Sequence, residues 1–495
     1  MAGRQGRLAT RAVTIAAAAI MGTVGQAAAD TLLRALAQAY QVNPQLNAQR
    51  AIVRQADEGV PQALSDYRPR VNANAGAGNQ FTSQESVVGP ALTGSDPCPS
   101  AGRKPTAHRC GSAVDIAAPV NTQKDRYWTA PRSVGITAQQ KLFDGFQTAN
   151  RTRAAESNVF AARETLRVIE QTVLLDAATV YMDVVRDTAI LEVQRSNVRV
   201  LVETLRQTRG RFKLGEVTKT DVAQAEAQLA AGQSQMLRAD SNLTTSKAKY
   251  RRVIGSNPGR LEPGLPVDHL SPRTLAAAID VAVRANPSVT AAMYGVDVAL
   301  LQVKVSEGAL YPTVTLLGNV QRAHDVNGVI SGQSSASVLL GVTVPLYQGG
   351  AEYSTIRQSK EALAQRRFDL AITRDQARAG VVQVWGEIQA TKAQIQAAQE
   401  QVRTSEVALK GVRMEARLGM RTTLDVLNAQ QALVNAQVSL VTAQHDRVVG
   451  SYDLLFAVGR LSPQTLRLPT SIYDPVVHYQ QVRDAWGGVR TPDGR

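Results

Sequence analysis

Histidine and cysteine are scarce in this sequence of 495 residues, which has five of the first and two of the second. The histidines are scattered, and no two of them lie at the spacing of a metal site or a catalytic triad. They are His108, His269, His324, His445 and His478. No glycine-rich phosphate loop occurs either. The sequence therefore predicts no enzyme and no cofactor, and His445, within a helical segment, is interpreted as packed or solvated.

Long apolar runs are missing beyond the start of the chain. The start combines a positive segment, a small apolar stretch and an Ala-x-Ala cleavage site, which are Arg4, Arg7 and Arg11, then 12–24, then 27–29. This order is typical of a secretory signal peptide, so we expect 1–29 to be removed and the mature chain to begin at Asp30. No cysteine lies near the cut, so we expect no lipid-modified N-terminus. No other run reaches about 20 apolar residues, so we expect no transmembrane helix, and a membrane would be met by strands.

The two cysteines, Cys98 and Cys110, lie in a stretch rich in Gly, Pro and Ser. In an exported protein we expect a disulfide to close this loop, with a contribution of about 3 kcal/mol through loop entropy. The alternative is two free thiols. A zinc site does not fit, because His108 is the one imidazole nearby and the spacing matches no tetrahedral pattern.

Acidic residues are outnumbered by basic ones, and the formal net charge is +14. Removal of the three signal-peptide arginines leaves 14 − 3 = +11. Such a charge suits nucleic acid, but the basic residues are dispersed along helical segments of an exported chain. We interpret them as solvated faces and expect no nucleic-acid partner.

The chain contains two copies of one unit. "RFKLGEVTKTDV" from Arg211 and "EARLGMRTTLDV" from Glu415 align at an offset of 204, and "LFDG" from Leu142 matches "LYQG" from Leu346 at the same offset. Earlier pairs, such as the two Asn-Pro pairs at 43–44 and 286–287, repeat at 243. The difference of 39 residues arises near the cysteine loop, so the first copy carries an insertion. We expect repeats at 30–257 and 268–462, followed by a tail at 463–495.

Each copy has the same internal order. An asparagine N-cap and a proline at the first helical position open a helix, which we expect to run to about Asp66 or Gly308. The period then changes to two, which predicts strands at about 70–82, 128–143, 311–322 and 334–346, each apolar on one face. This alternation is typical of membrane-barrel strands, and a soluble half-buried hairpin has the same pattern.

Proline is absent from 132–257 and from 346–462. Within these spans, 147–208 and 351–417 are rich in strong helix formers, and such helices could extend roughly 90–100 Å. Helices of that length run side by side as coiled coils. Each is expected to end at a Leu-Gly turn and restart after Thr218 or Thr422 as N-cap, with Asp221 or Asp425 in the first turn. The result is two helical hairpins, 147–255 and 351–459.

These residues together resemble the TolC family of outer-membrane efflux and secretion channels, in its non-lipidated branch. The matching phrases are "TVPLYQGG" at 343–350, "RLGMRTTLDVLNAQ" at 417–430, "RFKLGEVTKTDV" at 211–222 and the two Asn-Pro helix openings. The resemblance implies a mainly α protein with a membrane β-barrel, in which three protomers form an α-barrel and share a 12-stranded β-barrel. Four strands per chain cannot close a barrel alone, because an open edge is not tolerated in lipid.

The resemblance implies a function as well. The chain would be the outer-membrane channel of a tripartite efflux pump or a type I secretion system, a passive export duct across the periplasm. Its partners would be two further copies, a periplasmic adaptor, an inner-membrane transporter and outer-membrane lipid. The alternative is the periplasmic adaptor itself, which also carries a coiled-coil hairpin. Two hairpins with paired amphipathic strands count against that alternative.

The resemblance assigns roles to residues at the two Leu-Gly turns. Asp425 would form an acidic ring at the periplasmic entrance, and Arg421 with Asp221 would latch the closed state. A second family aspartate is Asn428 here, and a usually aromatic latch position is Ala416. The adaptor-docking tips would be Leu214, Gly215, Glu216, Leu418, Gly419 and Met420. Ordinary helix caps and first-turn acids explain the same residues without any gating.

Two further expectations concern the strand ends and the tail. Several aromatic residues flank the predicted strands, either as membrane girdles or as packing at the strand–helix junction. They are Phe81, Tyr127, Trp128, Phe143, Phe146, Tyr311 and Tyr347. The tail 463–495 contains Pro and Gly and shows no clear period, so we expect a loosely ordered periplasmic end.

Overall fold

The structure is a computed structural model that describes residues 31–88, 121–326, 330–492 and 494. The predicted signal peptide, His108 and both cysteines lie outside these residues, so the cleavage and the Cys98–Cys110 disulfide stay predictions. The elements before the first strand are α1 (Leu32–Val42), α2 (Pro44–Asp57), α3 (Gly59–Leu64) and the short η1 (Ser65–Tyr67). The first repeat continues with β1 (Arg70–Ala77), β2 (Gln80–Val88), β3 (Asn121–Thr129), β4 (Arg132–Phe143), α4 (Gln147–Lys213) and α5 (Lys219–Ile254). The rest comprises η2 (Asp268–Leu270), α6 (Leu275–Ala285), α7 (Pro287–Gly308), β5 (Thr313–His324), β6 (Gly332–Thr343), α8 (Ala351–Arg417), α9 (Thr423–Val458) and α10 (Pro475–Val482).

The chain divides into two compact units, and each takes segments from both predicted repeats. Unit 1 holds residues 163–291 and 371–474 together with the chain up to residue 52. Unit 2 holds 53–162, 292–370 and 475–495. The helical hairpin ends therefore belong to unit 1, and all six strands belong to unit 2.

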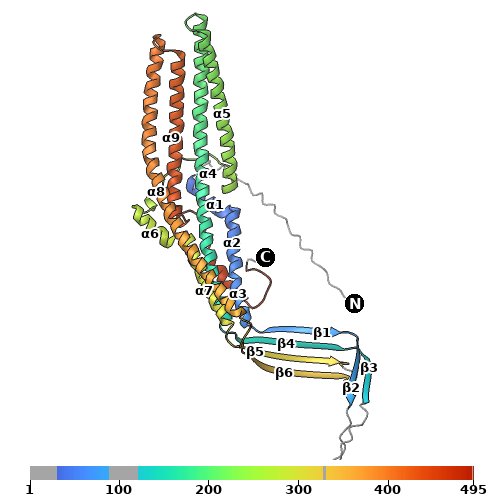
Figure 1. Ribbon diagram of the computed structural model, residues 1–495. Coiled ribbons are helices and arrows are strands. Elements are labelled where there is room, and N and C mark those ends of the chain that lie inside the picture. Colours follow the sequence, from blue (N-terminus) through green and yellow to red (C-terminus); the bar gives the residue numbers. More distant parts are fainter. Residues whose placement is uncertain (1–30, 89–120, 327–329, 493, 495) are drawn as a thin grey trace, which may run out of the picture. The chain divides into compact units, whose positions relative to one another are not determined.

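Unit 1 is built around the two long hairpins. Helices α4 and α8 have 67 residues each, and α5 and α9 have 36 each. Their first residues lie 204 apart, at 147 and 351 and at 219 and 423. In Figure 1 the upper parts of the four helices run side by side, and both hairpin turns lie at the same end. Near that end Leu201 and Leu205 of α4 pack with Ala225 of α5 and Leu427 of α9, so the two hairpins share one apolar core.

The predicted helix starts are confirmed. Asn43 Oδ1 accepts a hydrogen bond from the N–H of Gln45 at 2.9 Å, and Asn286 Oδ1 accepts one from Ser288 at 2.9 Å. Pro44 and Pro287 follow as the first helical residues, where a missing N–H costs nothing.

One helical segment among the described residues is apolar enough to cross a membrane by length and composition. It is Leu275–Gly308, with a mean hydropathy of 1.2 in its best window. The segment is interrupted by Asp280, Arg284 and Asp297, so it is not an uninterrupted run of about 20 apolar residues. The segment is divided at Asn286 into α6 and α7. On α6, Ala278 and Ala282 are fully buried against Val381 of α8 and Val458 of α9, so these apolar residues serve a helix core in unit 1.

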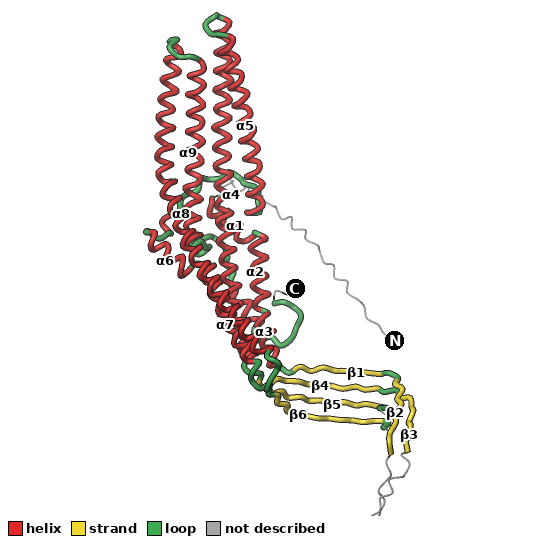
Figure 2. The backbone as a smooth tube through the Cα atoms, viewed as in Figure 1, coloured by secondary structure: helices red, strands yellow, loops and turns green. Residues whose placement is uncertain are grey.

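Unit 2 contains an antiparallel sheet in the order β1-β4-β5-β6 (Figure 2). Its register aligns Ala73 with Ile136, Ile136 with Val320, and Val320 with Ala336. The next row aligns Asn72, Thr137, Asn319 and Ser337. Because alternate residues point to opposite faces, one face of the sheet is apolar and the other polar, as the period-two pattern predicts.

The predicted strand limits in the first repeat are wrong. The predicted strand 70–82 is divided at Gly78 and Asn79 into β1 and β2, and β3 ends before Pro131 rather than continuing into β4. The N–H of Gly78 donates to the carbonyl of Pro131 at 3.1 Å and closes the sheet at this point. Pro131 has no N–H to extend a ladder. β2 and β3 pair with each other, and the rings of Phe81 and Trp128 contact in a tilted arrangement with centroids 5.2 Å apart. In the second repeat the strand ends differ from the predicted ones by two or three residues.

The expectation of a loosely ordered tail is also wrong. In unit 1 the N–H of Tyr473 donates to the Tyr40 hydroxyl at 3.3 Å. In unit 2 the tail forms α10, whose His478 Nδ1 lies 3.0 Å from Oδ2 of the fully buried Asp57. The Arg68 guanidinium stacks over Trp486 at 4.7 Å. These contacts hold the tail to each unit through buried and aromatic partners that a search for helical periodicity does not detect.

Candidate functional site

The two hairpin turns in unit 1 have the same backbone structure. Gly215 has φ +81° and Gly419 has φ +76°, a left-handed conformation that glycine adopts without steric cost. The N–H of Glu216 donates to Arg211 C=O at 3.0 Å, and the N–H of Met420 donates to Glu415 C=O at 2.9 Å. These bonds close a Schellman motif at the end of α4 and of α8. The sequence-predicted glycine caps are therefore present at both tips.

The predicted docking residues are exposed in both turns. Leu214, Leu418 and Met420 are 76%, 74% and 65% exposed, respectively. No atom lies within 4 Å of a Cβ placed on Gly215 or Gly419. Each tip therefore presents an apolar side chain next to a glycine whose surroundings are open, and backbone strain, rather than a clash, would oppose a larger residue there.

Asp221 and Asp425 both belong to capping boxes. Oδ2 of Asp425 accepts from the N–H of Thr422 at 2.9 Å and from its hydroxyl at 2.8 Å. Asp221 makes the same two bonds with Thr218, at 2.8 and 2.7 Å. Hydrogen bonds to the carboxylate lower the pKa of each aspartate, led by the backbone N–H for Asp425 and by the hydroxyl for Asp221. Both carboxylates are therefore charged at neutral pH and also begin a helix, as predicted.

Arg421 does not contact Asp221 within one chain. Its Nε donates to Glu415 Oε2 at 2.9 Å across the second turn. In the first turn Arg211 Nε donates to Glu216 Oε2 at 3.0 Å. Positions 211 and 415 are equivalent in the repeat, so the two turns are closed by ion pairs of opposite polarity. Glu415 was not among the residues predicted from the sequence. Opposite charges five or six residues apart around Leu-Gly would have indicated it.

Two further positions lack the side chains that the family usually has there, one in the latch and one in the acidic ring. Ala416 is buried, at 8% exposure, and contributes no aromatic ring. Asn428 is exposed on α9 and carries no charge. Asp425 is thus the one acidic residue among the two expected ring positions.

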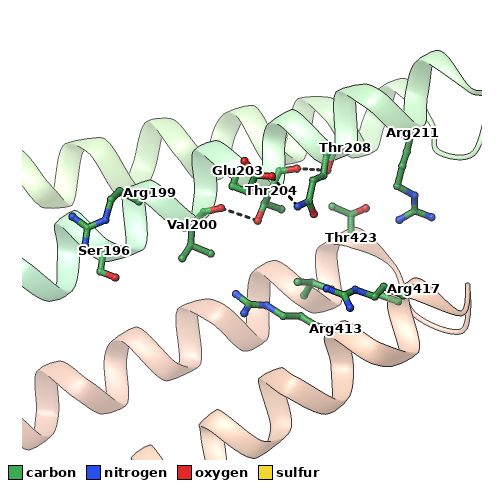
Figure 3. Close-up of a pocket in the computed structure, with 13 residues that line it drawn as sticks. Ser196, Arg199, Val200, Glu203, Thr204, Thr208, Arg211, Arg413, Arg417 and Thr423 are labelled. Carbon is green, nitrogen blue, oxygen red and sulfur yellow. Dashed lines mark hydrogen bonds between the residues drawn. The ribbon is translucent and has the colours of Figure 1, made fainter.

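Behind the tips lies a cleft of about 450 Å³ between the two hairpins (Figure 3). It is lined by α4, by the end of α8 and by the start of α9, and it includes Arg199, Arg211, Arg413 and Arg417. From the sequence these arginines were expected only to lie on solvated helix faces. The spacing of three and four residues along 196–211 of α4 would have placed that side of the cleft on one helix face.

A second polar cluster surrounds His445, which is 7% exposed in unit 1. Its Nε2 lies 3.1 Å from Asp183 Oδ1 on α4, and its Nδ1 lies 2.9 Å from Asp446 Oδ1. Burial alone would lower the pKa of His445, but its bonds to Asp183 and Asp446 raise it above the ordinary value. Arg186 pairs with Asp183 at 2.9 Å. The packed interpretation of His445 is confirmed, and the charged partners around it link α9 to α4.

The Asp187 carboxylate extends this cluster to α5. It accepts hydrogen bonds from Arg186 Nε at 2.9 Å and from the hydroxyl of Ser246. Three helices of unit 1 are therefore tied by one network of charged side chains.

Comparisons with known proteins agree with this arrangement. The family described as "Outer membrane efflux protein" matches residues 35–256 and 278–460. The outer membrane efflux protein BepC of Brucella suis is 38% identical over 98% of both chains. The alkaline protease secretion protein AprF of Pseudomonas aeruginosa is 24% identical over 60% of this chain and 63% of its own. The crystal structure of the Campylobacter jejuni outer membrane channel CmeC shares the fold, with a TM-score of 0.71 at 15% identity, covering 92% of this chain and 89% of that one. The chain therefore belongs to the family of outer membrane efflux proteins, the TolC family that its sequence motifs resemble.

Proposed function

We propose that this protein is the outer-membrane channel of a tripartite efflux pump or of a type I secretion system. BepC is named as an efflux protein and AprF as a secretion protein, and this chain shares their family. Membership of that family excludes the adaptor alternative and agrees with the prediction that the chain is not an enzyme. Its location is the outer membrane, with the helices extending into the periplasm.

The open sheet in unit 2 is the observation that carries the proposal. Among the described strands, β1 and β6 pair on one side only, and every residue of both is exposed. On the apolar face Val338 is 77% exposed and Val342 is 60% exposed. Lipid does not hydrogen-bond to an open edge, so a spanning sheet must close. Three copies supply 3 × 4 = 12 strands, and we infer a homotrimer that shares one barrel with outer-membrane lipid around it.

The hairpins of the same three copies would form the periplasmic tube. Each chain contributes two hairpins of equal length from the repeats 30–257 and 268–462, so three chains give a ring of six, and the tail 463–495 lies on its periplasmic side. In unit 1, Leu237 of α5 and Val407 of α8 are 64% and 67% exposed. Such apolar side chains on long helices suit packing against a neighbouring copy.

The ring of tips is the proposed gate. Three Asp425 carboxylates near one axis repel one another and attract cations. For a latch between Arg421 and Asp221 of neighbouring hairpins, Asp221 would replace Glu415 on Arg421 or bind the guanidinium N–H groups other than the Nε–H that donates to Glu415. Opening would then separate Arg421 from Asp221.

The mass of the detergent-extracted protein tests the trimer. Native mass spectrometry should give three mature chains. A monomer, or a protein that stays soluble without detergent, would refute the shared barrel, because the strands would then not lie in lipid.

The docking role of the tips needs its own experiment, and Gly215 and Gly419 offer the sharpest substitutions. A leucine at either position is strained by about 1–2 kcal/mol in a left-handed conformation and fills the open space beside the turn. We expect export to be lost while the trimer persists. Gly411→Leu is the control, since Gly411 lies within α8 with open space around it. Loss of the trimer in the tip variants would assign these glycines a structural role instead.

A further inference from the structure

The arginine-lined cleft behind the tips carries an inference about the partner that docks there. On α4 its lining residues are Ser196, Arg199, Glu203, Gln207 and Arg211, together with their neighbours Val200, Thr204 and Thr208. They recur every three to four residues, so they occupy one face of the helix. From 196 to 211 that face is about 22 Å long at 1.5 Å per residue. The cleft is therefore an elongated groove of about four helical turns.

The charge of this groove is strongly positive. Four arginines line it, and Glu203 is the one carboxylate among the lining residues. Glu203 already accepts a hydrogen bond from Arg206 at 2.9 Å, and Arg206 lies outside the groove. The groove therefore has no free carboxylate of its own to neutralise the guanidinium groups.

The four arginines form exposed ion pairs, bind a neutral group or have no partner among the described residues. Arg199 pairs with Glu192 at 3.3 Å, and both side chains are about two-thirds exposed, so the pair contributes about 0–1 kcal/mol. Arg211 pairs with Glu216 of its own turn at 3.0 Å, and the two side chains are 41% and 52% exposed, so this pair too contributes little. Arg413 donates to the neutral amide of Gln430 at 2.8 Å. For Arg417 the described part of the chain offers no hydrogen bond or ion pair. A ligand carboxylate would thus displace only weak interactions of these arginines.

Buried side chains hold Arg413 in place. Gln430 is 7% exposed, and its Nε2 donates to Oδ1 of Asn197 at 3.3 Å. Asn197 is 2% exposed on α4. This relay crosses from α8 through α9 to α4 and fixes the guanidinium at the groove wall, so less side-chain entropy is lost when an anion binds.

We propose that this groove receives carboxylates from an acidic helical segment of the periplasmic partner. The guanidinium fork pairs bidentately with carboxylates, and an amphipathic helix laid into a groove is a common recognition mode. Arg199 and Arg211 lie 12 residues apart on one helix, about 18 Å along its axis, so a single small ion cannot engage both. An acidic helix with glutamates over about three turns can. The inference rests on the proposed docking function.

A labelled peptide tests the groove directly. The probe is an alanine-based helical peptide of about 20 residues with glutamates at i, i+4, i+7 and i+11 on one face, and the receptor is the detergent-solubilised full chain. Fluorescence anisotropy should show binding, and the double variant Arg413→Gln/Arg417→Gln should weaken it by about tenfold or more. A peptide with lysines in the same positions should not bind. Equal binding of the two peptides, or unchanged affinity in the variant, would overturn the proposal.

Matched control variants distinguish binding in the groove from attraction of the peptide to positive charge elsewhere on the protein. Arg378→Gln/Arg403→Gln removes the same charge from α8 at surface pairs outside the groove and should leave the affinity within about twofold. Arg417→Gln alone breaks no hydrogen bond or ion pair among the described residues, so a loss of affinity there reports the missing guanidinium. Displacement of the peptide by inorganic phosphate at constant ionic strength would assign the groove to a free oxyanion and refute a helical ligand.

Different measurements refute the groove and the channel function. If Gly419→Leu abolishes export while the Arg413→Gln/Arg417→Gln variant binds the acidic peptide as the wild type does, docking at the tips stands and the groove inference falls. If the detergent-extracted protein is a monomer, the channel function falls whatever the peptide does.

Discussion

Two neighbouring positions on β6 distinguish a sheet with one face in lipid from a sheet with both faces in water. Val338 lies on the apolar face and is 77% exposed, and its neighbour Ser337 lies on the polar face and is also exposed. Within one chain an arginine at either position removes almost no packing, so both changes should stay within about 0.5 kcal/mol. The membrane-barrel and soluble interpretations of the sheet therefore predict different effects only because the surroundings of the new side chain differ.

The membrane makes these two substitutions unequal. Val338 is the seventh of twelve residues in β6, near the middle of the strand. An arginine on the lipid face at the bilayer midplane costs about 2–4 kcal/mol, which is roughly 30-fold to 700-fold in the folding equilibrium of each chain. Ser337 aligns with Asn319, Thr137 and Asn72 on the polar face, where water in a pore would solvate the new charge.

Denaturant unfolding from phospholipid vesicles measures the difference. Val338→Arg should lower the free energy of unfolding by about 2–4 kcal/mol per chain, and Ser337→Arg should leave it within about 0.5 kcal/mol. Equal effects would show that the sheet does not face lipid on one side only. Greater damage from Ser337→Arg would show that the apolar face has been assigned to the wrong side of the barrel.

Three further changes test the tips and the polar cluster. Thr422→Ala removes the N-cap bonds of α9 and should cost about 1 kcal/mol, seen as faster amide exchange in the first turn of α9; unchanged exchange would contradict the cap. Asp425→Ala should raise single-channel conductance or reduce divalent block, and unchanged values of both would refute the acidic ring. His445→Gln removes a group whose folded pKa is raised above 6.5, so its stabilising effect is fully present below pH 6.5 and is lost as pH rises through the folded pKa. The loss in thermal midpoint should be largest in acid and shrink in alkali, and a pH-independent loss would point to packing alone.

Patterns formed by residues near one another in the chain were readable from the sequence. A period of two marks the strands, because it places apolar side chains on one face. The proline-free spans rich in strong helix formers mark the long helices. The Asn-Pro openings, the threonine N-caps with an aspartate in the first turn and the Leu-Gly turns are confirmed, since each satisfies backbone groups within a few residues. The repeated motifs together were specific enough to indicate the family.

Contacts between distant segments were decided only by the tertiary structure. The division of the first predicted strand coincides with the bond between Gly78, which lies between β1 and β2, and Pro131, which lies between β3 and β4. The arginine groove depends on the rotation of α8 against α4. His445 meets Asp183 across helices 262 residues apart in sequence. Local periodicity specifies which face of an element is apolar, but which charges meet across that face follows from strand register and helix rotation, and these are set by the packing of the whole core.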